Sequence, residues 1–590
     1  MKQTYFIFIL IGLVSLPIFS QSFSISGEIR DDNNDLVAGA NVIITELDKG
    51  TTSDFNGKYQ LNNIPQGNYI LKVSYIGFET VIQNIEVFDN LRLNVQLKEA
   101  SFMLDGIMVT AQKREQKNKD VPIAITSYTG KFLSNTNTFG YDALSEFVPG
   151  LQVQIQSVNN PGIVVRGITS DSGDSRVESR VSVFQDGVSI SKSRGSVVEL
   201  YDMERVEVLK GPQGTLFGRG AQIGAIHLIQ NKAKNEKSGS IKTALGDFNQ
   251  RLITGHVNTP VVEDKLFFRF AGIYNSRDGF IDNLSGGDLN GKETLAFRAS
   301  FKYLIGDDTT LDLIANWQRD TPPGTSFKSG TFAPLGGDTN PNTFADLERG
   351  EELGLDRDVW GITAILKHNI SENWDLTSIT AYREFDSDEA FDADGTAAPV
   401  LYFREQSKGE QFSQELRFNY DSKKRLRGFF GANFFAEDGS QSVPLEINEQ
   451  SFATLLLSPE NLIVNGVPFL IPNIPNDPNF GPLAGAPLQE FNKERSTNFG
   501  ENYSGDIFAD GSYDVTDKLT ATLGLRATWE NSNAALEVEN ADQPAFLGNF
   551  IGSFPNNIFA PTNGRKSASE NFTSMVGRFS LNYNFNEEVS

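Results

Sequence analysis

A glycine-rich loop raises the first question of chemistry in this sequence. Residues 206–230 read VEVLKGPQGTLFGRGAQIGAIHLIQ. Four glycines lie between two apolar runs: Gly211, Gly214, Gly218 and Gly220. A phosphate-binding loop needs a following helix whose N-terminal N–H groups face the phosphate. Here the compact apolar run Ala225–Ile229 predicts a second strand, and no Gly-Lys-Ser/Thr ending marks a nucleotide site. The sequence therefore favours a tight connection between strands over a phosphate site.

The residue types offer few candidates for a metal site or a catalytic site. The chain has no cysteine, which excludes thiolate metal sites and cysteine nucleophiles. Its three histidines, His227, His256 and His368, do not show the i, i+4 spacing of a helical metal pair. No Ser/His/Asp set and no carboxylate pair with a catalytic spacing occurs. We therefore expect no resident metal, no cofactor and no enzymatic activity.

Two long loops are the remaining candidates for binding. The stretch EFDSDEAFDADG carries five carboxylates that suit Ca²⁺ by type: Asp386, Asp388, Glu389, Asp392 and Asp394. It lacks the spacing of an EF-hand, and a solvated acidic loop is the favoured interpretation. Residues 438–500 are rich in proline and apolar residues, so this loop either gathers ligand or packs on itself.

Composition and the first twenty residues indicate the compartment. The formal net charge of −24 argues against a nucleic-acid partner, and abundant Gly and Phe favour β structure. Residues 1–20 combine Lys2 with an apolar run from Tyr5 to Phe19 that Pro17 interrupts, which predicts a signal peptide rather than an anchor helix. No later stretch has the length of a transmembrane helix, so a membrane domain would have to be a β-barrel.

The elements that must position these residues fall into several segments. Residues 23–98 contain short alternating runs separated by turn signals, which predict six or seven strands in a small β-sandwich. The wording GEIRDDNNDLVAGANVIITELDKGTTSDFNGKYQLNNIPQGNYILKVSYIGFET resembles the carboxypeptidase regulatory-like domain family, which implies a transthyretin-like fold without catalysis.

Residues 99–120 form a polar linker with one apolar island. The island consists of Ile107, Met108, Val109, Thr110 and Ala111. It is too short to bury itself, but it can add as a strand to the exposed edge of a partner. An ordinary linker with a chance apolar patch is the alternative, and the sequence alone leaves both open.

Residues 121–235 hold the glycine loop within a mixed segment, with a helix expected near TFGYDALSEFVPGL. Its motifs, in order with the island, resemble the TonB box and plug domain of TonB-dependent outer-membrane receptors. The matching stretches are Ile107–Arg114, Asp120–Ile123, Val148–Leu151, Val165–Ile168, Asp186–Gly187, Glu204–Val208 and Gly211–Gly218. The resemblance gives the plug motif as Arg166, Gly167, Gly211, Pro212, Gln213, Gly214 and Gly218. The family's usual Asn-Ala-Thr-Gly-Gly-Ala-Ile-Asn run is replaced by residues 220–227, which end in His227.

Residues 236–590 alternate with period 2 in several runs of nine or more residues. In LTATLGLRATW one face carries only apolar side chains: Leu519, Ala521, Leu523, Leu525, Ala527 and Trp529. A soluble sheet would alternate in the same way. However, short turns near 260–264, 306–308, 371–373, 421–424 and 515–517 alternate with long loops near 277–292, 320–356, 387–407, 438–500 and 531–569. This segregation is typical of an outer-membrane barrel.

About twelve strands are expected between 238 and 585, whereas the family resemblance implies 22. We interpret the chain as ending part-way through the barrel, at a periplasmic turn. A complete twelve-strand barrel is the alternative, but its lumen would poorly accommodate a plug. The predicted fold is therefore mainly β: a transthyretin-like sandwich, an α/β plug domain and an antiparallel transmembrane β-barrel.

The resemblance also implies a function. It predicts active import across the outer membrane, with TonB and its ExbB/ExbD complex as partners and outer-membrane lipid around the barrel. The wording from VTAQKRE to GPQGTLFGR looks most like the iron-complex branch, which implies a ferric siderophore or similar chelate as ligand. A SusC-like importer of glycans or peptides, with a surface lipoprotein, is the alternative; a surface adhesin is a further one.

Overall fold

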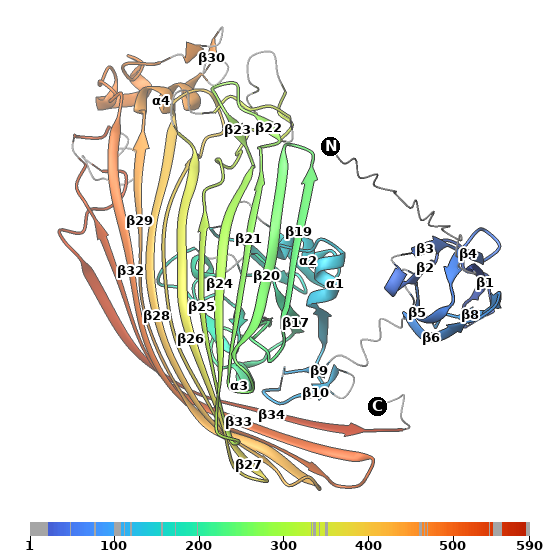
Figure 1. Ribbon diagram of the computed structural model, residues 1–590. Helices are drawn as coiled ribbons and strands as arrows, with labels where there is room; N and C mark the ends of the chain where they lie inside the picture. The colour runs from blue at the N-terminus through green and yellow to red at the C-terminus, as the bar shows by residue number, and fades with distance from the viewer. Residues whose placement is uncertain are drawn as a thin grey trace, which may run out of the picture. The chain divides into compact units, whose positions relative to one another are not determined.

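The computed structural model describes residues 22–585 except for the short stretches 33, 48, 76–77, 79, 99–107, 111, 119–120, 155–156, 158, 171–172, 197–198, 332, 334–337, 342, 348–351, 459–462, 465–466, 469, 542 and 547–556. The predicted signal peptide, residues 1–20, lies outside the described residues. The chain divides into two compact units, Met1–Gly106 and Ile107–Ser590. Each unit is described by itself (Figure 1).

The first unit is a sandwich of two four-stranded sheets. One sheet has the order β4-β1-β7 with β8 also paired to β1, and the other has the order β3-β2-β5-β6. The strands are β1 (Ser22–Arg30), β2 (Asn41–Ile44), β3 (Lys49–Thr52), β4 (Lys58–Pro65), β5 (Gly67–Ser74), β6 (Val81–Val87), β7 (Leu91–Arg92) and β8 (Val95–Gln96), with the 3₁₀ turn η1 (Thr45–Leu47) after β2. Alternate residues such as Ile25, Val42 and Leu71 are buried between the sheets. The predicted sandwich is therefore confirmed, with β3 as a strand that the sequence patterns missed.

The second unit begins with a small α/β domain, the plug. Its central sheet has the order β11-β17-β18-β15-β16, and a second sheet has the order β12-β13-β14. The elements are β11 (Ile125–Thr129), α1 (Gly130–Asn135), α2 (Tyr141–Ser145), β12 (Leu151–Gln154), β13 (Gly162–Val165), β14 (Ile168–Ser170), β15 (Val181–Gln185), β16 (Val188–Ile190), η4 (Ser193–Gly195), β17 (Met203–Lys210), α3 (Gly214–Phe217) and β18 (Gly224–Gln230). Before them lies a hairpin of β9 (Met108–Val109) and β10 (Gln116–Lys117).

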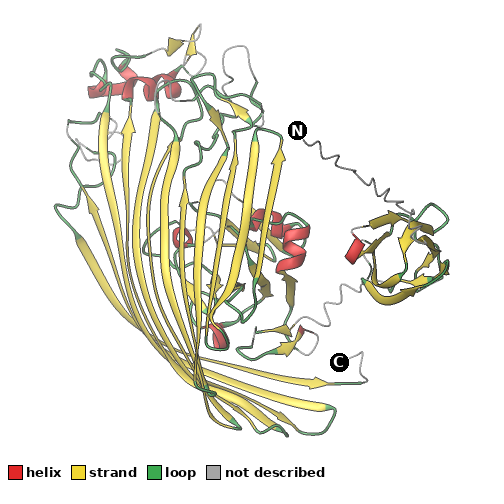
Figure 2. Cartoon of the chain, in the orientation of Figure 1, coloured by secondary structure: helices red, strands yellow, loops and turns green. Residues whose placement is uncertain are grey.

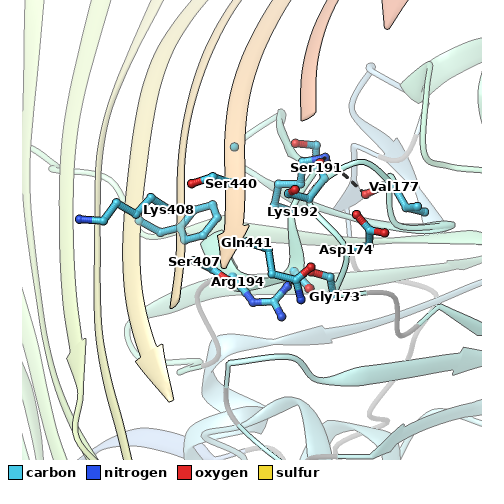
Figure 3. Close-up of a pocket in the computed structure, with 14 residues that line it drawn as sticks. Gly173, Asp174, Val177, Ser191, Lys192, Arg194, Ser407, Lys408, Ser440 and Gln441 are labelled. Atoms are coloured by element: carbon cyan, nitrogen blue, oxygen red, sulfur yellow. Dashed lines mark hydrogen bonds between the residues drawn. The ribbon is translucent and has the colours of Figure 1, made fainter. Parts of the chain in front are cut away.

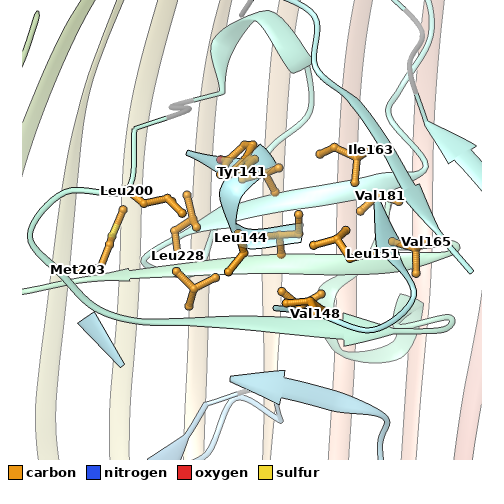
Figure 4. Packing of buried hydrophobic residues seen from close by; sticks show 14 of the residues in the cluster. Tyr141, Leu144, Val148, Leu151, Ile163, Val165, Val181, Leu200, Met203 and Leu228 are labelled. Carbon is orange, nitrogen blue, oxygen red and sulfur yellow. The ribbon is translucent and has the colours of Figure 1, made fainter. Parts of the chain in front are cut away.

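One apolar cluster holds the plug together. Tyr141 and Leu144 of α2 pack with Leu151 on β12 and Leu228 on β18, and all four are buried (Figure 4). Helix α2 begins where the sequence predicted a helix, although it has only five residues. Burying side chains of this size contributes roughly 1.5–3 kcal/mol each, so the cluster is the main source of plug stability.

The rest of the second unit is a single antiparallel sheet of twelve strands (Figure 2). Consecutive strands pair in sequence order: β19 (Ser238–Gly246), β20 (Gln250–Val262), β21 (Leu266–Arg277), β24 (Lys292–Ile305), β25 (Thr309–Asp320), β26 (Gly354–Ser371), β27 (Trp374–Asp392), β28 (Leu401–Asp421), β29 (Leu426–Ile447), β32 (Asn492–Asp514), β33 (Leu519–Val538) and β34 (Lys566–Tyr583). The number of strands in the sheet agrees with the predicted twelve. None of the helices in the described part of the chain is long and apolar enough to span a membrane.

The five predicted short turns all join consecutive strands at one rim, whereas three of the predicted long loops were drawn too long. Strand β27 continues to Asp392 and β28 starts at Leu401, so most of the predicted loop 387–407 is strand. In the same way β29 extends to Ile447 and β33 to Val538. The period-2 pattern ends before the strands do, because in the extensions apolar side chains no longer alternate regularly with polar ones.

The outward face of the sheet shows where the apolar band ends. Trp317 of β25 pairs with Trp360 of β26, which pairs with Glu384 of β27. From there the register sets four carboxylates side by side on neighbouring strands: Glu384, Glu410, Asp438 and Glu501. Charged side chains are costly on a lipid-facing surface. The hydrocarbon layer therefore ends on the short-turn side of this row. The strand extensions project beyond the row towards the long loops.

The long loops between strands contain short elements of their own. These are β22 (Ile281–Asp282), β23 (Asp288–Leu289), α4 (Glu449–Leu457), β30 (Ile463–Val464), β31 (Val467–Pro468) and η6 (Pro478–Leu483). Ala453 of α4 packs with Ile474, Leu488 and Phe546 in a buried cluster. The proline-rich loop therefore packs on itself, which is one of the two interpretations that the sequence allowed.

Candidate functional site

The glycine loop joins two antiparallel strands of the plug. Strands β17 and β18 pair along their whole length, and residues 211–223 connect them. The strand predicted after the glycines is therefore confirmed. Gly218 has φ +80° and ψ −140°, a conformation that is accessible only to glycine. A Cβ at Gly218 would lie 2.5 Å from the guanidinium of Arg526 on the barrel wall. The loop is thus shaped by a tight turn and by a close approach to the barrel.

Substituting alanine for Gly218 should therefore destabilise the second unit by about 1–3 kcal/mol. The Arg526 side chain cannot easily move away from the added Cβ, because it is buried and forms an ion pair with Asp506 at 2.8 Å. Gly214 in the same loop is the matched control, since a Cβ there would meet only Val576 at 4.0 Å. The measurement is the temperature at which the folded band is lost in heat-modifiable gel electrophoresis. Equal shifts for Gly218→Ala and Gly214→Ala would contradict this account.

The other predicted plug-motif residues lie around this loop. Arg166 and Gly167 form the turn between β13 and β14, with φ of +51° and +80°. The position of a Cβ on Gly211 would be 3.7 Å from the Arg166 guanidinium. Gln213 is buried, and its N–H donates to Ala221 O at 2.9 Å, whereas Pro212 is exposed. The structure thus brings Arg166 next to Gly211, and Gly214 begins α3.

The apolar island docks against the plug. Ile107 and Ala111 lie outside the described residues, so the placement concerns Met108, Val109 and Thr110. Met108 is 43% exposed, whereas Val109 is completely buried. Val109 packs in a cluster with Leu209 of β17, Phe217 of α3 and Phe508 of the barrel wall. The Thr110 N–H donates to Glu207 Oε1 of β17 at 2.8 Å.

Buried ion pairs connect the plug to the inner face of the sheet. Arg219, just after α3, donates to Glu178 at 2.8 Å and to Glu437 of β29 at 3.0 Å. Burial opposes the charge of Arg219, but these carboxylates outweigh it and raise the pKa of its guanidinium above the usual range. Arg194 of η4 pairs with Glu405 of β28. The plug is therefore held by charged pairs whose side chains are largely buried.

The linker residues after the island are anchored in the same way. Lys113 pairs with Glu415 of β28, and Arg114 pairs with Asp510 of β32 at 3.2 Å. Burial lowers the pKa of Lys113 to about 8, against the opposing attraction of Glu415. The hairpin of β9 and β10 is thus fastened to both the plug and the barrel wall.

Cavities lie between the plug and the sheet. A large one, of about 600 Å³, is lined by Thr110, Lys113, Arg205, His227 and Glu415, among others. A small one, of about 10 Å³, lies where the residues around η4 meet β28 and β29 (Figure 3). There Lys192 donates to Ser175 O at 2.7 Å and to Val177 O at 3.3 Å. The large cavity is polar and charged, and it is beside the docked island.

The candidate calcium residues are dispersed. Asp386 and Asp388 lie on β27 rather than in a loop, where they pair with Lys408 at 2.7 Å and Arg404 at 2.6 Å on β28. Asp394 accepts from the backbone of Leu401 at 2.9 Å, and burial raises its pKa to about 6. The acidic loop was therefore predicted wrongly at Asp386, Asp388, Glu389 and Asp392, because strand pairing continues through all four. Glu389 and Asp392 are also buried rather than solvated. Among the described residues no group of three His, Cys, Asp or Glu is placed to hold a metal.

Fold and site together define a curved antiparallel sheet of twelve strands with a plug domain against its inner face, and the comparisons identify the family. Residues 25–109 match the CarboxypepD_reg-like domain, residues 117–225 the TonB-dependent receptor plug domain, and residues 296–590 the TonB dependent receptor-like β-barrel. The chain belongs to the TonB-dependent receptors. It is an outer-membrane β-barrel protein of a receptor family, and not an enzyme.

Individual curated relatives match parts of the chain. SusC of Bacteroides thetaiotaomicron, a TonB-dependent receptor, is 28% identical over 255 residues, which cover 41% of this chain and 25% of SusC. The ferripyoverdine receptor of Pseudomonas aeruginosa is 23% identical over 366 residues, which cover 59% of this chain and 41% of that receptor. The chain thus spans less than half the length of these two relatives.

Solved structures share the fold. The ferric yersiniabactin uptake receptor FyuA of Yersinia pestis aligns with a TM-score of 0.63 and 16% identity, over 81% of this chain and 65% of that one. The siderophore receptor PiuA of Acinetobacter baumannii aligns with a TM-score of 0.58 and 16% identity, over 82% of this chain and 65% of that one.

The sequence patterns missed the charged residues that fasten the plug. Glu207 and Arg205 lie within Glu204–Val208, a stretch that was recognised only by its resemblance to the family. The sequence patterns did not indicate Arg219 or Glu437. A charged residue within an apolar strand, as in Val206-Glu207-Val208, is the signal that would have found Glu207, because burial of a charge requires a partner.

Proposed function

We propose that this chain imports a ferric siderophore or similar iron chelate across the outer membrane, driven by TonB. Ligand binds at the extracellular loops and the outer face of the plug. TonB, energised through ExbB/ExbD, then captures residues 107–111 by strand addition and pulls on the plug. No chemistry occurs in the chain itself, because the work is delivered mechanically to a locally weak element.

One observation carries the proposal: residues 108–110 form only a very short strand, and their contacts to the plug are those of Val109 and Thr110. Strand β9 has two residues, and Met108 is already 43% exposed. A two-residue strand is a marginal element, so a partner that offers a longer strand can compete for it. We therefore assign the TonB box to Ile107, Met108, Val109, Thr110 and Ala111.

We also propose a role for the plug motif and limits for the domains. Arg166, Gly167, Gly211, Pro212, Gln213, Gly214 and Gly218 shape the plug turns rather than bind ligand. The sandwich spans residues 23–98, the TonB-box linker 99–120, the plug 121–235 and the barrel 236–590.

Iron chelates are favoured by the names of the relatives. Besides the ferripyoverdine receptor, they include a metal-pseudopaline receptor of Pseudomonas aeruginosa and the ferrioxamine B receptor of Salmonella typhimurium. A second candidate, SusC-like import of glycans or peptides with a surface lipoprotein, is favoured by the match to SusC and by the sandwich domain.

Expression and uptake separate the two candidates. We expect transcription of the gene to rise under iron starvation, and its deletion to lower uptake of radioactive iron supplied as ferric catecholate or ferric hydroxamate chelates. The control is growth on polysaccharides with iron in excess, where expression should stay low. Induction by a polysaccharide, with iron uptake unchanged by the deletion, would refute the iron proposal in favour of the second candidate.

A further inference from the structure

Thr110 is held on the plug by a buried carboxylate. Besides the bond from its N–H, the Thr110 hydroxyl lies 3.3 Å from Glu207 Oε1. Arg205 donates to the same oxygen at 2.8 Å and to the Thr110 hydroxyl at 3.0 Å. The Glu207 side chain is completely buried, so water does not compete for these bonds. A partner that adds as a strand needs backbone donors such as the Thr110 N–H. Glu207 therefore already accepts the hydrogen bond of the Thr110 N–H, which the partner strand needs as a donor.

His227 lies next to this carboxylate, on the neighbouring strand β18. The register of β17 and β18 pairs Glu207 with His227, and His227 Nδ1 lies 3.8 Å from Glu207 Oε2. Neither of these two atoms has a hydrogen-bond partner among the residues that the structure describes. The other ring nitrogen, Nε2, accepts the Gly187 N–H at 3.1 Å. An accepting nitrogen carries no proton, so the proton of the ring belongs to Nδ1 and faces Glu207.

The surroundings keep Glu207 charged and dry. Burial opposes the charge, but His227, the Thr110 N–H and Arg205 outweigh it and hold the pKa of Glu207 below its usual range. The rings of Phe184 and Phe217 meet the His227 ring edge to face, with centroids 6.4 and 6.1 Å away. A carboxylate shielded in this way binds a backbone N–H more strongly than one in water.

We propose that Glu207 is a latch that keeps residues 108–110 on the plug, and that His227 is the positioning residue that orients its carboxylate. The inference rests on the proposed function, since it takes this segment to be the TonB box. Gly187 is in the turn between β15 and β16, and β16 leads to Ser191, which contacts Gln411 and Glu437 on the barrel wall. The latch thus joins the segment, through His227, to a plug hairpin that leads to the barrel wall.

Thiol labelling tests the latch without any ligand. The chain has no cysteine, so Val109→Cys supplies a single thiol at a completely buried position. The full chain is assayed in isolated outer membranes with a water-soluble maleimide. Adding Glu207→Gln should raise the labelling rate about tenfold, because a charged acceptor of the Thr110 N–H becomes a neutral one.

Two substitutions of His227 separate positioning from packing. An Asn side chain sets its amide nitrogen near the place of Nδ1, whereas a Gln side chain reaches the place of Nε2. His227→Asn keeps a donor for Glu207, and labelling of Val109→Cys should stay within about twofold of the parent. His227→Gln loses that donor, and labelling should rise as in Glu207→Gln. Equal labelling in the Asn and Gln variants would reduce His227 to a packing residue and overturn its positioning role.

The control is a thiol elsewhere in the plug. Val148→Cys lies in the main apolar cluster and is 1% exposed. Its labelling should not change with Glu207→Gln; a parallel rise at both thiols would mean general loosening of the plug and would sink the latch. No rise at Val109→Cys would do the same. Failure of the TonB-box assignment is recognised separately, as unimpaired binding of the TonB periplasmic domain to a Val109→Pro variant.

Discussion

Replacing Val109 by proline should abolish uptake while ligand binding is preserved. Proline has no N–H, so it removes a backbone donor from the strand that TonB would pair with, and it fixes φ near −65°, which restricts an extended strand. We expect uptake of radioactive ferric chelates to fall below about 10% of the parent level. Surface binding of the same chelates, measured on cells whose proton gradient has been collapsed, should remain unchanged. The hairpin of β9 and β10 lies at the end of the sheet opposite the long loops that carry α4 and β22, where we propose that ligand binds (Figure 1).

Val109→Ala is the matched control for this variant. Alanine keeps the N–H and loses only the packing of a side chain that is completely buried against Leu209 and Phe217. Uptake by Val109→Ala should therefore stay close to the parent level, and release of the segment should become easier. If Val109→Pro transports normally, the segment is a plain linker, the alternative interpretation that the sequence left open.

The elements of the fold were predictable where one physical pattern decides them. On the outward face of β33 the alternation of Leu519 to Trp529 shows which side faces lipid, and β33 begins at Leu519. The apolar runs on both sides of the glycine loop became β17 and β18. Short turns were equally visible, because only a few residue types make them.

The ends of the strands could not be predicted in the same way. Beyond the apolar band, backbone pairing continues between residues such as Asp388 and Gln406, although neither face has an apolar period. What stabilises these extensions is the pairing of the backbone ladder, which depends on the neighbouring strand. A single sequence shows each strand without its neighbour.

The site was less predictable than the fold because its contacts are distant in the chain. Thr110 and Glu207 are 97 residues apart, and Lys113 and Glu415 are 302 residues apart. Motif resemblance located the island and the glycine loop as separate pieces. Only the folded chain places Val109 and Phe217 in one cluster and His227 behind the carboxylate that binds Thr110.

Removing the carboxylate of Asp320 should be among the most destabilising single changes in the second unit. Asp320 on β25 binds Arg357 of β26 through two bonds of 2.9 and 2.7 Å, and both side chains are completely buried. Arg357 also donates to the carbonyl oxygens of Arg194 and Ser196 in the plug, at 3.2 and 3.4 Å. Asp320→Ala leaves the guanidinium buried without a counter-charge, which costs about 3–5 kcal/mol. The temperature at which the folded gel band is lost should fall accordingly.

The exposed pair Asp386–Lys408 shows why burial rather than distance decides this result. Its atoms are also 2.7 Å apart, but the two side chains are 56% and 69% exposed. Water and salt screen such a pair, so Asp386→Ala should leave the unfolding temperature unchanged. In the double variant Asp320→Leu/Arg357→Met no charge remains buried, and most of the lost stability should return, although the plug carbonyls of Arg194 and Ser196 lose their donor. Equal effects of Asp320→Ala and Asp386→Ala would mean that the Arg357 site is open to water, and that the plug is not anchored to the barrel there by a buried charge.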